Sequence, residues 1–374
     1  MIFRSNAVSL YLRTSFLIVV MLGMVACAPV QERAIVEKPS LLIYPPPPDE
    51  PRYAYERTIY GSADVTPRNA DSALKRALTG EGVTSHGLVK PYAVKVHRGR
   101  IFISDSAARF VKVFDVQQDR YFEIGDDELG PLTKPLGLDV DLAGNLYVAD
   151  ATTKAIMVYT RDGKFIRKIG GPKVFERLSS VTVDAVRQRL FVTDIGGVSS
   201  DQHNIKVFDL NTGAHQFDLG KRGIGPGEFN LPRDVAIGVN GQIYVVDGGN
   251  FRIQVFDQGG KFINSFGSVG KQMGNFARPK ELATDPSGNV YVVDAAFGNF
   301  QIFTPEGDLL MYIGERSDKD GPAHYMLPSG IDVDEDGRVY MVDQWFKKID
   351  IFRPAGLPEE AGFLAKRPVL PPVK

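Results

Sequence analysis

The sequence predicts an all-β fold, a six-bladed β-propeller with four-stranded blades. A short β-branched run that ends in aspartate occurs six times, each time followed by a turn and a second apolar run. The whole unit recurs every 43 to 54 residues, a spacing typical of propeller blades. The composition agrees with this fold, because 38 Gly and 24 Pro supply the turns that many short strands need.

The clearest copy of the repeat covers residues 243–257. Two apolar runs, Ile243–Val246 and Ile253–Phe256, flank a turn made of Asp, Gly, Gly and Asn. The aspartate that ends the first run recurs once in each unit, as Asp105, Asp150, Asp194, Asp247, Asp294 and Asp343. A carboxylate at this place can accept backbone N–H bonds and fix the turn, and a catalytic group has no reason to appear in every blade. We therefore expect these aspartates to be structural.

Each unit begins with an innermost strand that follows a proline, except in the third unit. The leading residues are Pro91, Pro135, Leu178, Pro232, Pro279 and Pro328. A fourth strand, ending in an apolar residue and glycine, closes only the first five units. The same ending occurs near the N-terminus, in Tyr55–Gly61. We expect residues 53–61 to complete the sixth blade and to close the ring, which would leave no open sheet edge.

The N-terminus has the features of a secretory signal. Arg4 and Arg13 precede an apolar run, Phe16–Val25, which is too short to span a membrane. The segment Met24–Cys27 resembles the lipobox of bacterial lipoproteins, in which the cysteine is lipidated. An ordinary signal peptide, cut before Cys27 and leaving a free thiol, is the alternative.

The lipoprotein resemblance implies a location in the cell envelope. In that family an aspartate after the lipidated cysteine favours retention at the inner membrane, so Ala28 implies the outer membrane, on either its periplasmic or its surface side. Cys27 is the single cysteine, which excludes disulfides within the chain and multi-cysteine zinc sites. A covalent lipid on Cys27 is the one added group we expect.

The chain divides into four parts by composition. They are a signal peptide at 1–26, a lipidated proline-rich tether at 27–51, the propeller at 52–354 and a proline-rich tail at 355–374. The tether contains Pro45–Pro48, which favours an extended spacer. A helix is expected over 71–79, with Asp71 as its N-cap, in the loop before the first complete blade.

The repeat resembles the NHL repeat, best over residues 241–267. The matching residues are Gly241, Ile243, Tyr244, Val245, Asp247, Asn250, Arg252, Ile253, Val255, Phe256, Gly260, Phe262, Phe266 and Gly267. WD40 repeats are excluded, because the chain has only one Trp and five His. The resemblance supports a six-bladed propeller but no particular activity, since such propellers include binders, scaffolds and enzymes. RNA binding, known for some NHL propellers, is disfavoured by export and by a net charge of −1.

Basic residues gather near the leading residue of each repeat and are the candidate ligand-binding residues. Those directly before the leading residue, or directly after the proline, are Lys90, Lys134, Arg177, Arg233, Arg278 and Lys280. In a propeller these positions lie near one mouth of the central channel, where positive charge would attract an anionic ligand. The alternative is a mixed, solvated rim in which Glu176, Asp234 and Glu281 neutralise several of these cations.

Three histidines, His86, His203 and His324, are expected on the same face as the basic residues. Propeller lyases of related fold bind a catalytic metal through histidines at the channel mouth, and three histidines suffice for zinc. The positions of these three differ from one repeat to another, so ordinary surface histidines are the simpler interpretation. No P-loop or Gly-x-Ser-x-Gly motif occurs in a suitable context.

Taken together, the sequence indicates a lipid-anchored binding scaffold in the bacterial cell envelope, with no cofactor and no nucleic-acid partner. Its partners would be envelope proteins or an anionic glycan or peptide. The alternative is a metal-dependent lyase or lactonase with its site at the channel mouth.

Overall fold

The structure, a computed structural model, describes residues 41–66, 85–197 and 199–365. The expected signal peptide, Cys27 and the expected helix over 71–79 lie outside these residues. Within them, no helix has the length and apolar character needed to cross a membrane.

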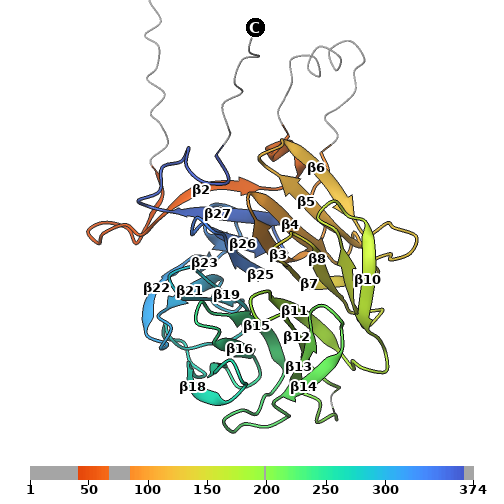
Figure 1. The fold of residues 1–374 in the computed structure, drawn as a ribbon. Coiled ribbons are helices and arrows are strands. Elements are labelled where there is room, and N and C mark those ends of the chain that lie inside the picture. The colour runs from red at the N-terminus through yellow and green to blue at the C-terminus, as the bar shows by residue number, and fades with distance from the viewer. Residues whose placement is uncertain (1–40, 67–84, 198, 366–374) are drawn as a thin grey trace, which may run out of the picture. The chain divides into compact units, whose positions relative to one another are not determined.

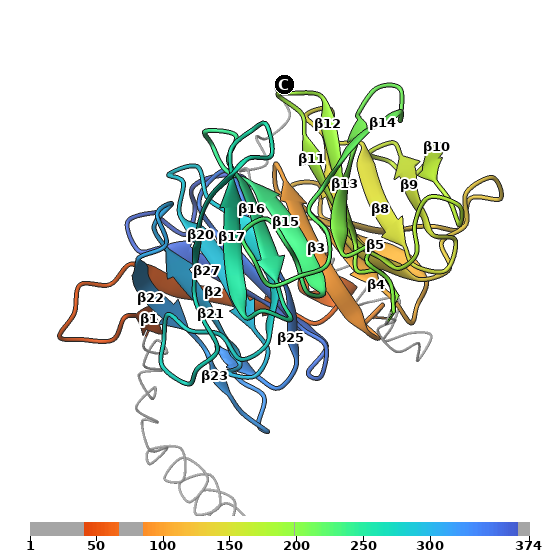
Figure 2. The same cartoon turned by 90° about the horizontal axis from the view of Figure 1, so that it is seen from below.

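The described residues from 42 onward form six antiparallel sheets arranged around a central channel (Figures 1 and 2). The first three blades contain β3 (Pro91–His97), β4 (Arg100–Asp105), β5 (Phe110–Asp115) and β6 (Arg120–Ile124); β7 (Pro135–Val140), β8 (Leu146–Asp150), β9 (Ala155–Tyr159) and β10 (Phe165–Gly170); and β11 (Leu178–Asp184), β12 (Arg189–Asp194), β13 (Asn204–Asp209) and β14 (His215–Leu219). In each blade the first-named strand is innermost, and neighbours in sequence are hydrogen-bonded.

The remaining blades follow the same order. They contain β15 (Pro232–Ile237), β16 (Ile243–Asp247), β17 (Arg252–Phe256) and β18 (Phe262–Phe266); β19 (Pro279–Thr284), β20 (Val290–Asp294), β21 (Asn299–Phe303) and β22 (Leu309–Ile313); and β25 (Pro328–Val333), β26 (Val339–Asp343), β27 (Lys348–Pro354) and β2 (Tyr53–Ile59). Each innermost strand contacts the next, and β25 contacts β3, so the ring is closed. A short helix, η1 (Ser62–Asp64), follows β2, and a short parallel pair, β23 (Glu315–Arg316) and β24 (His324–Tyr325), links the last two blades.

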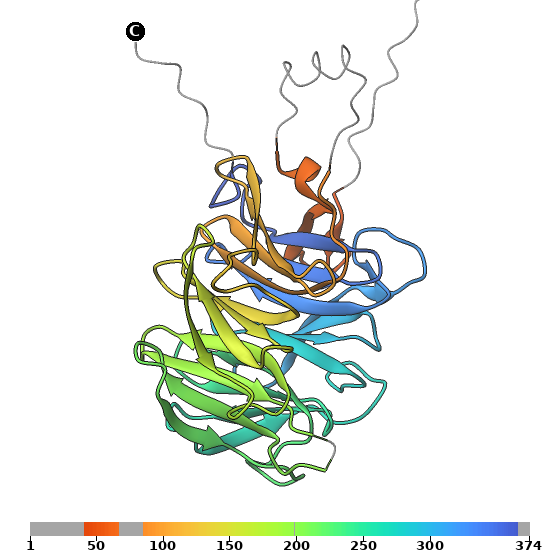
Figure 3. The same ribbon diagram turned by 90° about the vertical axis from the view of Figure 1, so that its right-hand side faces the viewer.

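The closure predicted from the sequence is confirmed. β2 pairs antiparallel with β27, which joins the two ends of the described chain in one sheet (Figures 1 and 3). The propeller begins earlier than expected, because β1 (Ile43–Tyr44) adds a fifth strand to this sheet within the segment assigned to the tether. The Tyr44 ring packs edge-on against Phe352 at 5.7 Å, and this contact fixes β1 on the blade.

The hydrophobic core consists of clusters between adjacent blades. Along β16, Ile243 and Val245 pack toward the third blade, whereas Tyr244 and Val246 pack toward the fifth. Successive side chains of a strand point to opposite faces of its sheet, and here a neighbouring blade covers each face. This arrangement explains why the middle strands are apolar at consecutive positions instead of alternating.

The repeated aspartates are structural, as predicted. Asp150 Oδ2 accepts the backbone N–H groups of Thr133 (2.6 Å) and Lys134 (2.8 Å), while its Oδ1 accepts those of Thr152 (3.0 Å) and Thr153 (2.9 Å). One buried carboxylate thus fixes both the loop that enters the blade and the turn between its two middle strands. The equivalent aspartates accept backbone N–H groups of the entering loop in every other blade.

The segment after β27 packs against the ring over its described part, up to residue 365. Leu364 is only 4% exposed, and the Phe363 carbonyl accepts a hydrogen bond from Gln117 Nε2 at 3.1 Å. Arg338 donates to the Ala361 carbonyl at 2.8 Å. The segment therefore connects the sixth blade to the first, and residues 355–365 of the expected tail belong to the folded unit.

Candidate functional site

The loops that enter the innermost strands hold four of the predicted basic residues in equivalent places. They are Lys90, Lys134, Arg177 and Arg278, and their side chains are exposed. The backbone N–H of each donates to the repeated aspartate of its blade, at 2.8 to 3.0 Å. The fold therefore fixes the backbone from which these cations extend.

Arg233 and Lys280 are the second residues of β15 and β19. Both are half-buried and lie close to these loops. Burial and the positive charges of Arg278 and Arg233 lower the pKa of Lys280 to about 8. Burial also lowers the pKa of Arg233, aided by the charges of Arg177 and Arg278. Arg233 is thus near Arg177 and Arg278, and Lys280 is near Arg278 and Arg233. We call these four residues the basic cluster.

The acids that could have neutralised these cations make other contacts. Glu176 Oε2 accepts the Gly197 N–H at 2.8 Å, and Asp234 accepts hydrogen bonds from Ser180 Oγ (2.5 Å) and the Leu282 N–H (3.0 Å). Glu281 attracts Lys280, but less strongly than the two arginines repel it. Among the described residues, none of the six predicted basic side chains takes part in an ion pair.

Tyr92 and Trp345 are among the aromatic residues on the same side of the ring as the basic cluster. Tyr92 follows Pro91 at the start of β3; burial raises the pKa of its hydroxyl, Glu281 raises it further and Arg233 opposes the rise. Tyr92 of the first blade therefore lies near residues of the fourth and fifth blades, across the channel. Trp345, the single tryptophan, is 61% exposed in the turn between β26 and β27.

The three candidate histidines are in separate surroundings. The His86 ring stacks on Tyr121 with centroids 5.2 Å apart. His203 is buried, and its Nδ1 accepts the Leu231 N–H at 3.1 Å. His324 Nε2 lies 3.2 Å from a Glu315 carboxylate oxygen. Across the described ranges, no three His, Cys, Asp or Glu side chains are grouped so that they could hold a metal ion.

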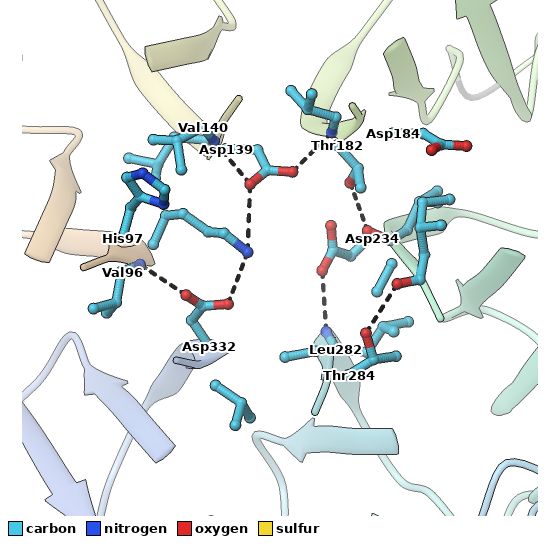
Figure 4. Close-up of a pocket in the computed structure, with 18 of the residues that line it drawn as sticks. Val96, His97, Asp139, Val140, Thr182, Asp184, Asp234, Leu282, Thr284 and Asp332 are labelled. Carbon is cyan, nitrogen blue, oxygen red and sulfur yellow. Dashed lines mark hydrogen bonds and ion pairs between the residues drawn. The ribbon is translucent and has the colours of Figure 1, made fainter. Parts of the chain in front are cut away.

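A second candidate site was missed by the sequence analysis. It is a cavity of about 450 Å³ in the channel, drawn in Figure 4. The innermost strands and the loops that follow them line it, so it lies at the end away from the basic cluster, whose residues lie where the innermost strands begin. Asp139, Asp234, Glu281 and Asp332 face it. An acid between two apolar residues, as in Leu138–Val140 and Ile331–Val333, was the signal that could have identified it.

The cavity acids join neighbouring innermost strands through backbone N–H groups. Asp139 Oδ2 accepts from Val183 and Asp332 Oδ2 from Val96, both at 2.7 Å (Figure 4). Lys95 Nζ lies between these two acids, 3.4 Å from Asp139 and 3.0 Å from Asp332. Burial raises the pKa of Asp234 and of Asp332 to about 6.

Comparisons with known proteins agree with the repeat and with the fold. The NHL repeat model matches residues 229–256, which span the entry to the fourth blade and its first three strands. Among curated proteins, "Protein brain tumor" of Drosophila melanogaster is 28% identical over 142 residues, which is 37% of this chain and 13% of that protein. The match thus spans about an eighth of that relative's length.

Solved structures give the same architecture at low identity. A protein of unknown function from Bacteroides thetaiotaomicron superposes with a TM-score of 0.60 and 17% identity, covering 80% of this chain and 75% of that one. Virginiamycin B lyase from Staphylococcus aureus, bound to quinupristin, gives 0.52 and 16% over 74% and 85%. Such identities support the fold alone. The chain is therefore a six-bladed β-propeller that carries an NHL repeat in its fourth blade.

Proposed function

We propose that this chain is a lipid-anchored binding scaffold of the bacterial cell envelope that holds an anionic partner at the basic cluster. The observation that carries the proposal is the absence of ion-pair partners, among the described residues, for Arg177, Arg233, Arg278 and Lys280. Arg233 and Lys280 are half-buried, and like charges at such positions without ion-pair partners raise the free energy of the ligand-free protein.

An anionic ligand would remove this repulsion. Carboxylate, sulfate or phosphate groups are attracted by several cations at a rim of low dielectric constant, where each interaction is stronger than in water. Arginine suits this role, because its planar guanidinium can donate two parallel hydrogen bonds to an oxyanion. An anionic glycan, or an acidic segment of an envelope protein, has the required chemistry.

The proposed location rests on the N-terminal sequence. Met24–Cys27 resembles a lipobox, and two or more acyl chains on Cys27 would give stable membrane anchoring. Ala28 favours the outer membrane. The tether before β1 would leave the propeller free to meet partners beyond the bilayer surface.

The described histidines give no support to the metal-dependent lyase or lactonase alternative. His86, His203 and His324 each contact a different neighbour, so they do not form one ligand set. Binding is the function that the geometry favours.

Binding of acidic peptides and anionic glycans, measured by fluorescence anisotropy, tests the proposal. We expect Arg177→Glu combined with Arg278→Glu to weaken binding at least about tenfold and to reduce its dependence on salt. Lys261→Glu, an exposed reversal in the turn between β17 and β18, should leave affinity unchanged. Equal affinity of wild type and double variant for every anionic ligand would overturn the proposal.

The anchor is tested separately by fractionation. Wild-type protein should be found in the outer-membrane fraction and should incorporate labelled fatty acid. Cys27→Ala should remove the label and release the protein from the membrane. A Cys27→Ala protein that stays in the membrane fraction would contradict lipid anchoring through this residue.

A further inference from the structure

The acidic cavity, the 450 Å³ space at the channel end away from the basic cluster, has a strong excess of negative charge. Nine acidic residues line it, against Lys95 and Arg187 as the permanent cations. Its volume lies within the range of small-molecule sites. Several of the acids cap turns or join strands, so an excess of negative charge alone does not identify a ligand site. A site for a cationic ligand requires acids that have no protein cation beside them.

The cations are not spread evenly around the cavity: Arg187 of the third blade pairs with Asp184, and the described lining residues of the fourth and fifth blades include no Lys or Arg. On the side of the first, second and sixth blades, Lys95 lies between Asp139 and Asp332. On the side of the fourth and fifth blades, the charge of Asp234 raises the pKa of Glu281, and neither acid is in an ion pair in the described structure. Asp234 is satisfied by Ser180 and the Leu282 N–H.

Glu281 is the unsatisfied group on the side of the fourth and fifth blades. The residue is part of the cavity lining and only 8% exposed, and its buried Oε1 has no hydrogen-bond partner. A buried carboxyl oxygen without a partner is costly and needs an explanation. A ligand that donates a hydrogen bond and carries positive charge would satisfy this oxygen.

We propose that the acidic cavity binds an organic ammonium group carried on an aliphatic chain, which takes beside Asp234 and Glu281 the place that Lys95 takes beside Asp139 and Asp332. The proposal does not rest on the basic cluster, which lies at the other end of the channel.

The walls of the cavity select this chemistry over other cations. No three described acids or histidines are grouped for a metal ion. In the part of the chain that the structure describes, the lining contains no Phe, Tyr or Trp, the rings whose faces recognise quaternary ammonium groups, and His97 is its one side chain with an aromatic ring. Its apolar lining is aliphatic, and at the mouth Leu142, Val186 and Val239 are 71%, 80% and 58% exposed. A linear alkyl chain matches this surface.

Ligand binding would be coupled to release of a proton. Burial and the charges of Asp234 and Asp332 raise the pKa of Glu281 well above its usual range, while Lys280 opposes the rise. Tyr92 is a further titratable group near Glu281. An ammonium ion stabilises the ionised carboxylate, so Glu281 should lose its proton as the cation binds, and affinity should fall as the pH is lowered.

Isothermal titration of the whole protein with 1,5-diaminopentane tests the proposal. We expect binding, release of a proton seen in buffers of different ionisation enthalpy, and no binding of 1,5-pentanediol. Glu281→Gln keeps the shape of the side chain and should weaken binding at least about tenfold. Glu306→Gln, an exposed acid outside the cavity, is the matched control and should bind as wild type does.

A second titration distinguishes the two sources of an ammonium group. A peptide with one lysine between two leucines should bind if the natural ligand is a protein side chain, and the diamine alone should bind if it is a small amine. Either result supports the proposal if Glu281→Gln weakens it. The proposal would be overturned if neither ligand bound. It would also be overturned if binding released no proton and the affinity were the same in the Glu281→Gln variant.

Discussion

Arg338 Nε lies 2.8 Å from Glu56 Oε2 and links the two ends of the described chain. Glu56 is in the middle of β2, and Arg338 precedes β26. The arginine side chain is fully buried and the glutamate 6% exposed. Asp336 and the Ala361 carbonyl also accept hydrogen bonds from the guanidinium. Ring closure therefore depends on a buried ion pair as well as on strand pairing.

Glu56→Gln should destabilise the protein by about 3 kcal/mol, because it leaves a buried guanidinium without its main counter-charge. Equilibrium denaturation in urea measures this loss. Arg120→Ala, which removes a partner of the exposed Asp162, is the control and should cost less than about 1 kcal/mol. Equal effects of the two substitutions would show that closure does not depend on the buried pair.

Asp150→Ala should destabilise the second blade strongly, because the carboxylate accepts four backbone N–H bonds. Each unsatisfied buried donor is costly, so we expect a loss of about 3 kcal/mol or more. Hydrogen exchange should also increase at Thr133 and Lys134. Asp318→Ala, at an exposed loop position, should change neither quantity. Unchanged exchange at Lys134 would contradict the role assigned to Asp150.

The blades and the closing strand were predictable because their signals are local. An apolar run, an aspartate and a glycine turn specify a hairpin wherever they occur, and β2 carries the same signal as the other outer strands. The acidic cavity was not predictable in this way. Asp332 accepts its hydrogen bond from Val96, and Lys95 pairs with Asp139 and Asp332, so each contact joins separate blades.

The alternative of a mixed rim, in which acids neutralise the basic residues at the channel mouth, assumed that residues adjacent in sequence pair with each other. Lys280 and Glu281 are adjacent in β19, as Arg233 and Asp234 are in β15. Successive side chains of a strand point to opposite sides, so adjacent opposite charges need not meet. In the structure the acids face the cavity and the basic residues form no ion pair with them.

Lys280 should be more reactive than the other lysines toward amine-specific reagents at pH 8. Its pKa is lowered from the usual 10.5 to about 8 by burial and by Arg278 and Arg233, so about half of it is a free amine there. Acylation followed by peptide mass spectrometry measures the rate. Arg278→Gln should raise the pKa and slow the reaction. A rate for Lys280 no higher than that of exposed Lys261 would contradict the prediction.

Lys280 should also make stability depend on pH. Between about pH 8 and 10.5 the folded protein binds fewer protons at this site than the unfolded chain, so stability rises with pH. Lys280→Met removes this effect. The variant should therefore be more stable than wild type at pH 7, and its advantage should disappear near pH 10.5. Denaturation midpoints at several pH values test this, and an advantage that stays constant would refute it.

Asp234→Asn tests a pH dependence of stability opposite in direction to that of Lys280. Burial raises the pKa of Asp234 from 3.8 to about 6, so the folded state binds more protons than the unfolded chain between these values. Wild-type stability should fall as the pH rises through this interval. Between pH 4 and pH 8, the unfolding free energy of the asparagine variant should rise relative to that of wild type by at most about 3 kcal/mol. A difference in unfolding free energy that does not change with pH would contradict the raised pKa.

Gly137→Ala should weaken the contact between β7 and β11, because no space exists for a side chain at this position. A Cβ on Gly137 would lie 2.6 Å from Ser180 Cα, which is backbone and cannot rotate away. The two innermost strands would have to separate, and we expect a loss of about 2 kcal/mol in urea denaturation. Gly356→Ala is the matched control, since nothing lies within 4 Å of its Cβ position. That variant should stay within about 0.5 kcal/mol of wild type. A loss of stability for Gly137→Ala as small as that for Gly356→Ala would contradict the prediction. It would show that the contact between β7 and β11 leaves room for a larger residue.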